Sequence, residues 1–560
     1  MFKKTLLSLS ILLTACGGSD GGGDTPPAIP DNIEIEITTA QGSLNQRLDC
    51  TNPATINSAC DLRIYQIMVE SFIDADINAD YQTGYGTSHH NGDIAGITAS
   101  LDYIKALGMN AIWLTPIFES ITKDGQTDWE DRLDATGYFT SDYFAIDPSF
   151  GTLEQARELV KQAHDRGMYV FFDGVFGHHK GNVEPSPTGL LPTNGTAQAS
   201  GNEAVYPDDL AFYKEVATYW INELQIDGWR LDQAYQVDVK YWDDIRLAVE
   251  NASALNDNRY SLNGEMNNPL GYMVAEIWSG EDDISQQAYG ESGSPALKSA
   301  FDFPMRYSLV QTFAVEESGY GNTPATKLND GFNTHFVYPD HAQPNLMLGN
   351  HDLVRFGDLL QRGQLANPED PQYWTRHKAA LSFIAAYSGP ITLYYGDEIG
   401  DQVEDFAAKI EPCSGDSGLC DDHVARSSAK IEGLPTEIGG EITVLNPQQK
   451  DLKQYVSDLM TIRSDHPALS NGSRTHIHSD NNIYIDRKDF ASDHILYLVN
   501  TKSSEASVTL SGSAIGSDGD LTNLLKTQTI SNNGGLYEIT LPAFSAEFYQ
   551  IVSPTIEGPK

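Results

Sequence analysis

Basic residues are scarce in this sequence. Its 560 residues hold 35 Lys and Arg against 78 Asp and Glu, which gives a formal net charge of −43 and a pI near 4.4. Phosphate backbones and anionic membrane surfaces are recognised through Lys and Arg, so this balance excludes nucleic acid and an anionic lipid surface as partners. A neutral or cationic partner is favoured, and we expect most of the acidic residues to serve solubility.

Cysteine and long hydrophobic runs are scarce as well. The chain has five cysteines, and beyond its N-terminal segment no stretch approaches the roughly 18 apolar residues that a membrane-spanning helix needs. No C-x-x-C has a matching second pair, which excludes the common structural zinc sites. Four cysteines form two close pairs, Cys50 with Cys60 and Cys413 with Cys420. We predict a disulfide in each pair, formed in an oxidising compartment.

The N-terminus has the pattern of an export signal. Residues 1–4 include two lysines, residues 5–13 are apolar, and the sequence LTAC at 13–16 resembles a bacterial lipobox. We predict a lipoprotein signal peptide over 1–15, lipidation of Cys16, and a flexible tether and N-terminal segment over 16–58. The protein is then exported and anchored, in the periplasm or at the outer membrane of a Gram-negative bacterium, and contacts membrane only through this lipid. The alternative is an ordinary secretory signal with a chance cysteine.

From residue 59 to 470, short β-type runs alternate with longer helical patterns, which is typical of a parallel sheet with helical crossovers. A stretch rich in Pro, Gly, Asn and Thr at 179–208 predicts a short excursion domain after the third run. Over 471–560 the pattern changes to β-branched strands with Gly, Ser and Asn turns, which predicts an antiparallel β-sandwich. Eight runs are the number that an α/β (β/α)8 TIM barrel needs: Arg63–Val69, Ala111–Thr115, Tyr169–Val175, Gly228–Asp232, Met273–Ile277, Ser299–Phe303, Asn345–Gly349 and Ile391–Tyr395.

In such a barrel the chemistry belongs at the C-terminal ends of the strands. A retaining glycosidase needs one carboxylate kept ionised as nucleophile and a second carboxyl whose raised pKa lets it act as an acid. Arg230 and Asp232 lie two residues apart on one strand and project to the same face, so the guanidinium keeps the aspartate ionised. The full set at these strand ends is Asp173, His178, Arg230, Asp232, Glu276, His351 and Asp352.

Four segments then carry a family resemblance. DGVFGH (173–178), DGWRLD (227–232), AEIW (275–278) and LGNHD (348–352) resemble, in this order, the signature segments of the α-amylase family, glycoside hydrolase family 13. YFAIDPSFGT (143–152), ALGMNAIWLTPIF (106–118) and GPITLYYGDEIG (389–400) are similar too. The resemblance covers roughly residues 60–550.

The resemblance implies roles for these residues. Asp232 is the implied nucleophile, Glu276 the acid and base, and Asp352 the third carboxylate that stabilises the strained sugar. The implied function is that of a retaining, α-amylase-like glycoside hydrolase acting on α-linked glucans such as starch, glycogen or maltooligosaccharides. The implied substrate-binding residues are Tyr138, His178, Arg230, His351 and Asp173, with Trp229, Tyr235 and Trp278 as candidate sugar-stacking surfaces.

Several alternatives stay open. An α-glucosidase, a cyclomaltodextrinase or a transglycosylase of the same family would use the same machinery, and a non-catalytic glucan-binding lipoprotein is a more distant possibility. Phe139 replaces an aspartate that closes the pocket of chain-end glucosidases, which favours an open cleft. The acidic loop at 121–134 favours short oligosaccharides instead. The sequence does not determine the oligomeric state.

Two departures from the family pattern concern calcium. Gly177 replaces the family's calcium-binding Asn, and Tyr235-Gln236 replaces its Lys-His pair, so we do not expect the usual calcium between barrel and excursion domain. Oxygen-bearing side chains at alternating positions of another loop suit Ca²⁺ better, and several subgroups of the family bind calcium there. We predict a Ca²⁺ site there, with a solvated acidic loop as the alternative, at Asp74, Asp76, Asn78, Asp80 and Asp93.

Overall fold

The computed structural model describes residues 33–551 except for 43–47, 52–55, 82, 84–85, 121–133, 197–198, 200, 411–419, 436–437 and 439–441. The predicted signal peptide, Cys16, Cys413 and nearly all of the acidic loop at 121–134 lie outside the described residues. Within the described ranges, every helix is too short or too polar to reach across a bilayer.

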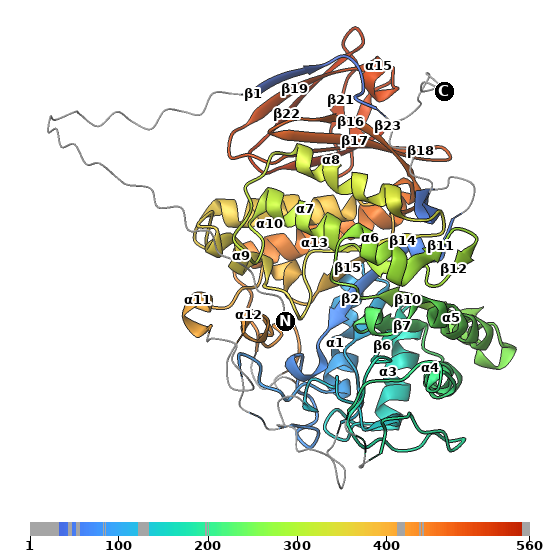
Figure 1. Ribbon diagram of the computed structural model, residues 1–560. Helices are drawn as coiled ribbons and strands as arrows, with labels where there is room; N and C mark the ends of the chain where they lie inside the picture. The colour runs from blue at the N-terminus through green and yellow to red at the C-terminus, as the bar shows by residue number, and fades with distance from the viewer. Residues whose placement is uncertain are drawn as a thin grey trace, which may run out of the picture.

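Eight parallel strands close into a barrel in the lower part of the molecule (Figure 1). Their side chains alternate between a layer that faces the helices and an interior filled by large apolar groups such as Trp113, Phe171 and Phe301. This confirms the predicted TIM barrel, and the observed strand ends differ from the expected ones by one or two residues. The strands follow one another around the barrel as β2 (Arg63–Ile67), β3 (Ala111–Leu114), β6 (Tyr169–Gly174), β7 (Gly228–Leu231), β10 (Tyr272–Ala275), β13 (Ser299–Phe301), β14 (Gln343–Met347) and β15 (Ile391–Tyr394).

Helices connect consecutive strands and cover the outside of the barrel. Local sequence sets where they begin: the side chain of Asp93 accepts a hydrogen bond from the Gly96 amide at the start of the first, and Thr152 with Gln155 forms a capping box at the next. The helices are α1 (Ile94–Ala106), α3 (Leu153–Asp165), α4 (Leu210–Leu224), α5 (Val239–Ser253), α6 (Glu281–Ile284), α7 (Phe303–Phe313), α8 (Thr326–Asn333), α9 (Phe356–Arg362), α10 (Pro371–Ala385), α11 (Phe406–Lys409), α12 (Asp421–Ala425), α13 (Pro447–Asp465) and α14 (Pro467–Asn471).

Three short strand pairs lie in the described loops between these elements. They are β4 (Phe118–Glu119) with β5 (Asp142–Ile146), β8 (Tyr260–Leu262) with β9 (Glu265–Asn267), and β11 (Gly290–Glu291) with β12 (Ser294–Pro295).

The buried ammonium group of Lys180 joins the excursion between β6 and α4 to the barrel. The Lys180 side chain is fully buried, and its Nζ lies 2.7 Å from the Ser120 carbonyl oxygen and 2.5 Å from Asp134 Oδ1. Its backbone amide donates to the Thr140 carbonyl at 2.9 Å. A buried ammonium is tolerated only when paired in this way, so these contacts fix the excursion against the segment that carries Tyr138.

The C-terminal domain is a β-sandwich of two sheets packed on the side of the barrel that carries α8 and α10 (Figure 1). Apolar side chains of both sheets, among them Ile485, Leu496, Val508 and Ile539, fill the space between them. One sheet holds β16 (Ser473–Ser479), β17 (Ile483–Phe490), β18 (Asp493–Asn500), β23 (Ala546–Ile551), β20 (Leu521–Asn523) and β21 (Thr529–Ile530); the other holds β1 (Ile33–Ile37), β19 (Ala506–Ser511) and β22 (Leu536–Leu541), and α15 (Gly512–Ile515) follows β19.

Part of the predicted N-terminal segment forms a strand, whereas residues 16–32, which include the predicted tether, lie outside the described residues. Strand β1 runs parallel to β19, with Ile33 opposite Ala506 and Ile37 opposite Leu510, so the beginning of the chain completes the C-terminal domain. It is the blue strand among the red ones in Figure 1. The predicted Cys50–Cys60 disulfide is formed, and Cys420 is disulfide-bonded as well.

Candidate active site

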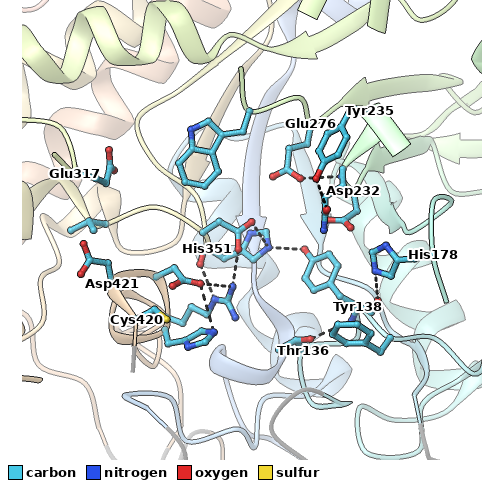
Figure 2. A pocket seen from close by; sticks show the side chains of 18 residues that line it. Thr136, Tyr138, His178, Asp232, Tyr235, Glu276, Glu317, His351, Cys420 and Asp421 are labelled. Carbon is cyan, nitrogen blue, oxygen red and sulfur yellow. Dashed lines mark hydrogen bonds and ion pairs between the residues drawn. The ribbon is translucent and has the colours of Figure 1, made fainter. Parts of the chain in front are cut away.

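A cavity of about 720 Å³ opens at the C-terminal ends of the barrel strands (Figure 2). Six of the residues predicted from the sequence line it: Tyr138, His178, Asp232, Glu276, His351 and Asp352. Arg230 and Asp173 are fully buried directly beneath them. The structure therefore gathers all eight predicted catalytic and substrate-binding residues at one opening.

Arg230 is the electrostatic centre of this group. From β7 its Nη1 donates to both oxygens of Asp173 at 2.9 Å and to Asp232 Oδ1 at 3.0 Å. Its Nη2 lies 2.6 Å from Glu276 Oε1. One guanidinium thus contacts three buried carboxyl groups, and its five N–H groups in a rigid fork suit that geometry.

The two oxygens of Asp232 have different surroundings. Oδ1 accepts from Arg230, whereas Oδ2 has no hydrogen-bond partner among the described residues. Burial raises the pKa of Asp232 to about 6, against the opposing charge of Arg230. Oδ2 is therefore the oxygen left available to bond to a substrate atom once the carboxyl is ionised.

Glu276 follows β10 and faces Asp232 across the guanidinium. Its Oε1 contacts Arg230, and its Oε2 accepts from the Gln233 backbone amide at 3.1 Å. Burial raises the pKa of Glu276 to about 7, and the nearby charge of Asp232 adds to the effect despite Arg230. A carboxyl that keeps its proton near neutral pH is suited to protonate a departing oxygen.

Asp352 is held ionised on the opposite wall. Burial alone would raise its pKa, but His351, Arg426 and Arg230 together lower the pKa of Asp352 to about 2. Arg426 Nη2 donates to Asp352 Oδ1 at 2.7 Å, and Arg426 Nε donates to the His351 carbonyl at 2.8 Å. Burial lowers the pKa of His351 to about 3, so at neutral pH its ring is uncharged and Arg426 is the adjacent cation that remains.

Tyr138 and the two histidines form the floor. The Tyr138 hydroxyl donates to Asp173 Oδ2 at 2.8 Å and lies 2.7 Å from His351 Nε2, and the Tyr138 and His351 rings are parallel. The His178 ring contacts the Tyr138 carbonyl and the side chain of Gln236. Asp173 also accepts from Trp113 Nε1, so it supports the floor from below rather than facing the cavity.

The three aromatic residues predicted to stack on sugars differ in how far they are buried. Trp229 is fully buried in the core, whereas Tyr235 and Trp278 line the cavity with about half of each side chain exposed, 52% and 50%. The Trp278 ring is stacked on Phe303 and its Nε1 donates to the Tyr307 hydroxyl at 2.8 Å. Trp278 is thus a fixed flat surface open to a ligand.

Sequence reasoning missed the far wall of the cavity. Figure 2 shows Glu317, Cys420 and Asp421 on the side opposite His178 and Asp232. In the described part of the chain, Cys420, Asp422 and His423 form a group whose ligand atoms lie within 4.8 Å of one another, but the Cys420 sulfur is committed to a disulfide and is no thiolate ligand. The acid-rich run CDDHVAR (420–426) was the one available signal, and nothing local in it points to Asp352.

The predicted calcium loop folds around Asp93. Asp93 Oδ1 caps α1, and its Oδ2 accepts from the Ala75 and Asp76 amides at 2.7 Å each. Asp80 Oδ1 is buried without a hydrogen-bond partner among the described residues. Burial raises the pKa of Asp80, and the charges of Asp74, Asp93 and Asp76 raise it further. Among the described residues, no three of these acids bring their carboxylate oxygens within 4.8 Å of one another.

Known proteins resemble this chain in sequence and in structure. The model of the α-amylase catalytic domain matches residues 66–186 and 208–432, and the unmatched stretch between them falls in the excursion. The crystal structure of AmyP with maltose is 58% identical over 90% of this chain and all of that one, with a TM-score of 0.84; a glutamate-to-glutamine variant of AmyP with maltotriose is 59% identical over 89% and 98%, also at 0.84. A cyclomaltodextrinase of Thermoanaerobacter pseudethanolicus is 26% identical over 80% of this chain and 71% of that protein. An intracellular maltogenic amylase of Bacillus subtilis is 28% identical over 60% and 55%.

Proposed function

The chain belongs to the α-amylase family of α-glucan-acting glycoside hydrolases, and on that premise we propose that it cleaves maltooligosaccharides with retention of configuration. The observation that carries the proposal is the shared guanidinium of Arg230, which contacts Asp232 and Glu276 but leaves Asp232 Oδ2 without a partner among the described residues. Burial meanwhile raises the pKa of Glu276 to about 7. The complexes of AmyP with maltose and maltotriose support a short α-glucan as the ligand of this cleft.

The reaction proceeds in two steps on these side chains. Asp232 Oδ2 attacks the anomeric carbon and forms a glycosyl ester, while the bond to the leaving sugar breaks and Glu276 gives that oxygen its proton. The Glu276 carboxylate then takes a proton from water, whose oxygen attacks the same carbon and releases Asp232. Asp352, held ionised by Arg426, faces the positive charge that develops on the sugar ring.

Product analysis tests the function. Maltotriose, maltoheptaose, a cyclodextrin and pullulan are incubated with the enzyme, and the products are separated by chromatography while the anomeric form of the new reducing end is read by NMR. We expect the α-anomer from maltoheptaose. Rapid opening of the cyclodextrin would favour the cyclomaltodextrinase alternative, which the first relative's name supports. No release of reducing sugar from any glucan would contradict the proposal.

The pH profile of kcat/KM follows from the raised pKa values of Asp232 and Glu276. Asp232 acts ionised and its pKa is about 6, so we expect activity to be lost as the pH falls through this value. Glu276 acts protonated and its pKa is about 7, so activity is lost again as the pH rises through it. The two groups titrate as a coupled pair, so the profile on maltotriose should be a narrow bell. A profile that stays flat across this range would contradict the assignment.

We also propose that the loop of Asp74, Asp76, Asn78, Asp80 and Asp93 holds a calcium ion. The unpartnered Asp80 Oδ1 and the crowding of like charges around it fit a hard cation with oxygen ligands. When bound, the ion would neutralise the negative charges of this loop. The family's calcium between barrel and excursion does not fit this chain, because the Gln236 side chain fills the space beside Gly177 and the Lys180 ammonium is buried at this junction.

Removing calcium is expected to lower stability. At a hundredfold excess over Kd a ligand contributes roughly 2.7 kcal/mol, so EGTA should lower Tm by about 2–3 °C in a chain of this size. Asp80→Asn should show the lower Tm already without EGTA, and elemental analysis should find no calcium in it. The exposed Asp330→Asn serves as the matched control. Metal-free wild-type protein with a Tm indifferent to EGTA would disprove the site.

A further inference from the structure

We propose that Gln236 is a positioning residue that orients His178 and favours one tautomer of its ring, beside a glycine at position 177 that leaves room for residue 236. The consequence for turnover rests on the proposed function, since it requires His178 to contact the substrate. The placement of Gln236 and Gly177 does not depend on it.

Gly177 and Gln236 are packed against each other. A Cβ added at Gly177 would lie 2.2 Å from Gln236 Oε1 and 2.4 Å from Gln236 Cβ. The backbone of Gly177 is not in the left-handed region, so alanine would meet no conformational obstacle there. Because one of the clashing atoms is Gln236 Cβ, rotation of the side chain alone does not relieve the contact. Position 177 must therefore leave room for residue 236, and Gln236 Oε1 fills the rest of that space.

The Gln236 amide is oriented from its other end. Its Nε2 donates to Gln233 Oε1 at 3.0 Å, and the same oxygen accepts from the Tyr235 hydroxyl at 2.7 Å. With its NH₂ turned to Gln233, Gln236 presents Oε1 to His178 Nδ1 at 2.9 Å. Both ring nitrogens face oxygen acceptors, because Nε2 lies 3.2 Å from the Tyr138 carbonyl, and a neutral ring has one proton to share between them. The shorter contact, to Gln236, favours the proton on Nδ1.

This tautomer determines what the cavity offers a sugar. His178 Nε2 is left with a lone pair, 3.2 Å from the carbonyl oxygen of Tyr138. Two acceptors therefore lie side by side at the floor, and both suit hydroxyl donors of the sugar. Without Gln236 the ring is free to carry its proton on Nε2, which donates to that carbonyl and leaves the sugar hydroxyl without its acceptor.

The same turn also reaches the proposed acid. Gln236 ends the short 3-10 helix η4 (Ala234–Gln236), and Gln233 precedes it with φ of 40°. In this left-handed conformation the Gln233 amide donates to Glu276 Oε2 at 3.1 Å. The bond from Gln236 to Gln233 thus ties the orientation of His178 to the segment that positions Glu276.

The first experiment reads the tautomer directly. ¹⁵N spectra of histidine-labelled protein report which nitrogen of His178 carries the proton, and His178→Ala assigns the signal. We expect protonated Nδ1 in the wild type and in Gln236→Glu, which keeps the acceptor. Gln236→Met should shift the pattern towards protonated Nε2. An unchanged pattern in Gln236→Met overturns the proposal, and it does so whether or not the protein hydrolyses maltotriose.

The second experiment is a double-mutant cycle on maltotriose. Gln236→Met should lower kcat/KM by roughly three- to tenfold, the size of one lost positioning bond, and Gln236→Glu should retain most of the activity. The effect of Gln236→Met should vanish in a His178→Ala background. Gln236 is exposed, so we expect its variants to fold; Gln454→Met, an exposed glutamine on α13, is the control. Additive losses of Gln236→Met and His178→Ala would show that Gln236 does not act through His178.

Discussion

Asp232→Asn is expected to lower kcat on maltotriose by about 10⁴-fold or more, because the amide cannot form the glycosyl ester. Asparagine has nearly the shape of aspartate, and its side-chain oxygen can still accept from Arg230 Nη1. The fold should therefore persist, with Tm close to that of the wild type. Steady-state rates and differential scanning calorimetry measure the two quantities.

Glu276→Gln is the matched variant that separates the two carboxyls by role. It removes the proton donor but leaves Asp232 Oδ2 in place, so a loss of roughly 10²–10⁴ is expected on maltotriose. An aryl α-maltoside whose phenol departs without a proton should restore the first step, and the glycosyl-enzyme should accumulate as a burst of phenol. Asp232→Asn should show no burst.

Two outcomes would contradict the assignment. A burst from Asp232→Asn would exclude Asp232 as the nucleophile. An undiminished rate of Glu276→Gln on maltotriose would exclude Glu276 as the acid. Loss of activity with a large fall of Tm in both variants would instead indicate a structural role. Circular dichroism of each variant is the control for folding.

The parts of this site that the sequence predicted share one property. Asp173, Arg230, Glu276 and His351 each lie at or just after the end of a barrel strand, so a local pattern fixes both the strand and the end of it. Once eight strands are recognised, closure of the barrel brings these residues together without further information. The alternation of Ile and Glu in β1 is an equally local signal, but it does not specify that β19 is its partner.

The parts that were not predicted depend on contacts between distant segments. Arg426 reaches Asp352 across 74 positions of the chain, from a turn that follows the last barrel strand. Gln236 packs against Gly177, which lies 59 positions earlier in the chain and leaves room for it. Such pairs leave no periodicity in the sequence, and a lone glycine, glutamine or arginine in a loop is compatible with many different structures. The three-dimensional packing is needed to connect them.

Arg230→Met is expected to have the largest effect on stability and activity together. Methionine fills much of the volume but removes the only cation that contacts Asp173, Asp232 and Glu276 together among the described residues. Removing one partner of a buried ion pair typically costs about 3–5 kcal/mol. The nucleophile also becomes less reactive, because the pKa of Asp232 rises further without the guanidinium and a smaller fraction of Asp232 is ionised at neutral pH. We expect kcat to fall by about 10³-fold or more.

The pH dependence of stability shows whether Arg230→Met acts through the lost positive charge or only through lost packing. In the wild type, burial already raises the pKa of Asp173 and Asp232 to about 6 and of Glu276 to about 7. A carboxyl whose pKa is higher in the folded than in the unfolded state binds more protons when folded, so stability falls as the pH rises through the folded pKa. Without Arg230 these pKa values rise further, and the unfolding free energy should drop more steeply between pH 5 and 8 than in the wild type, by roughly 1.4 kcal/mol for each further unit of pKa shift. Arg246→Met, which removes a buried arginine paired with Asp243 and Glu250 away from the cavity, should lose stability without this slope and keep kcat. Parallel stability curves for Arg230→Met and the wild type would show that the guanidinium does not hold the three carboxyls in their ionisation states.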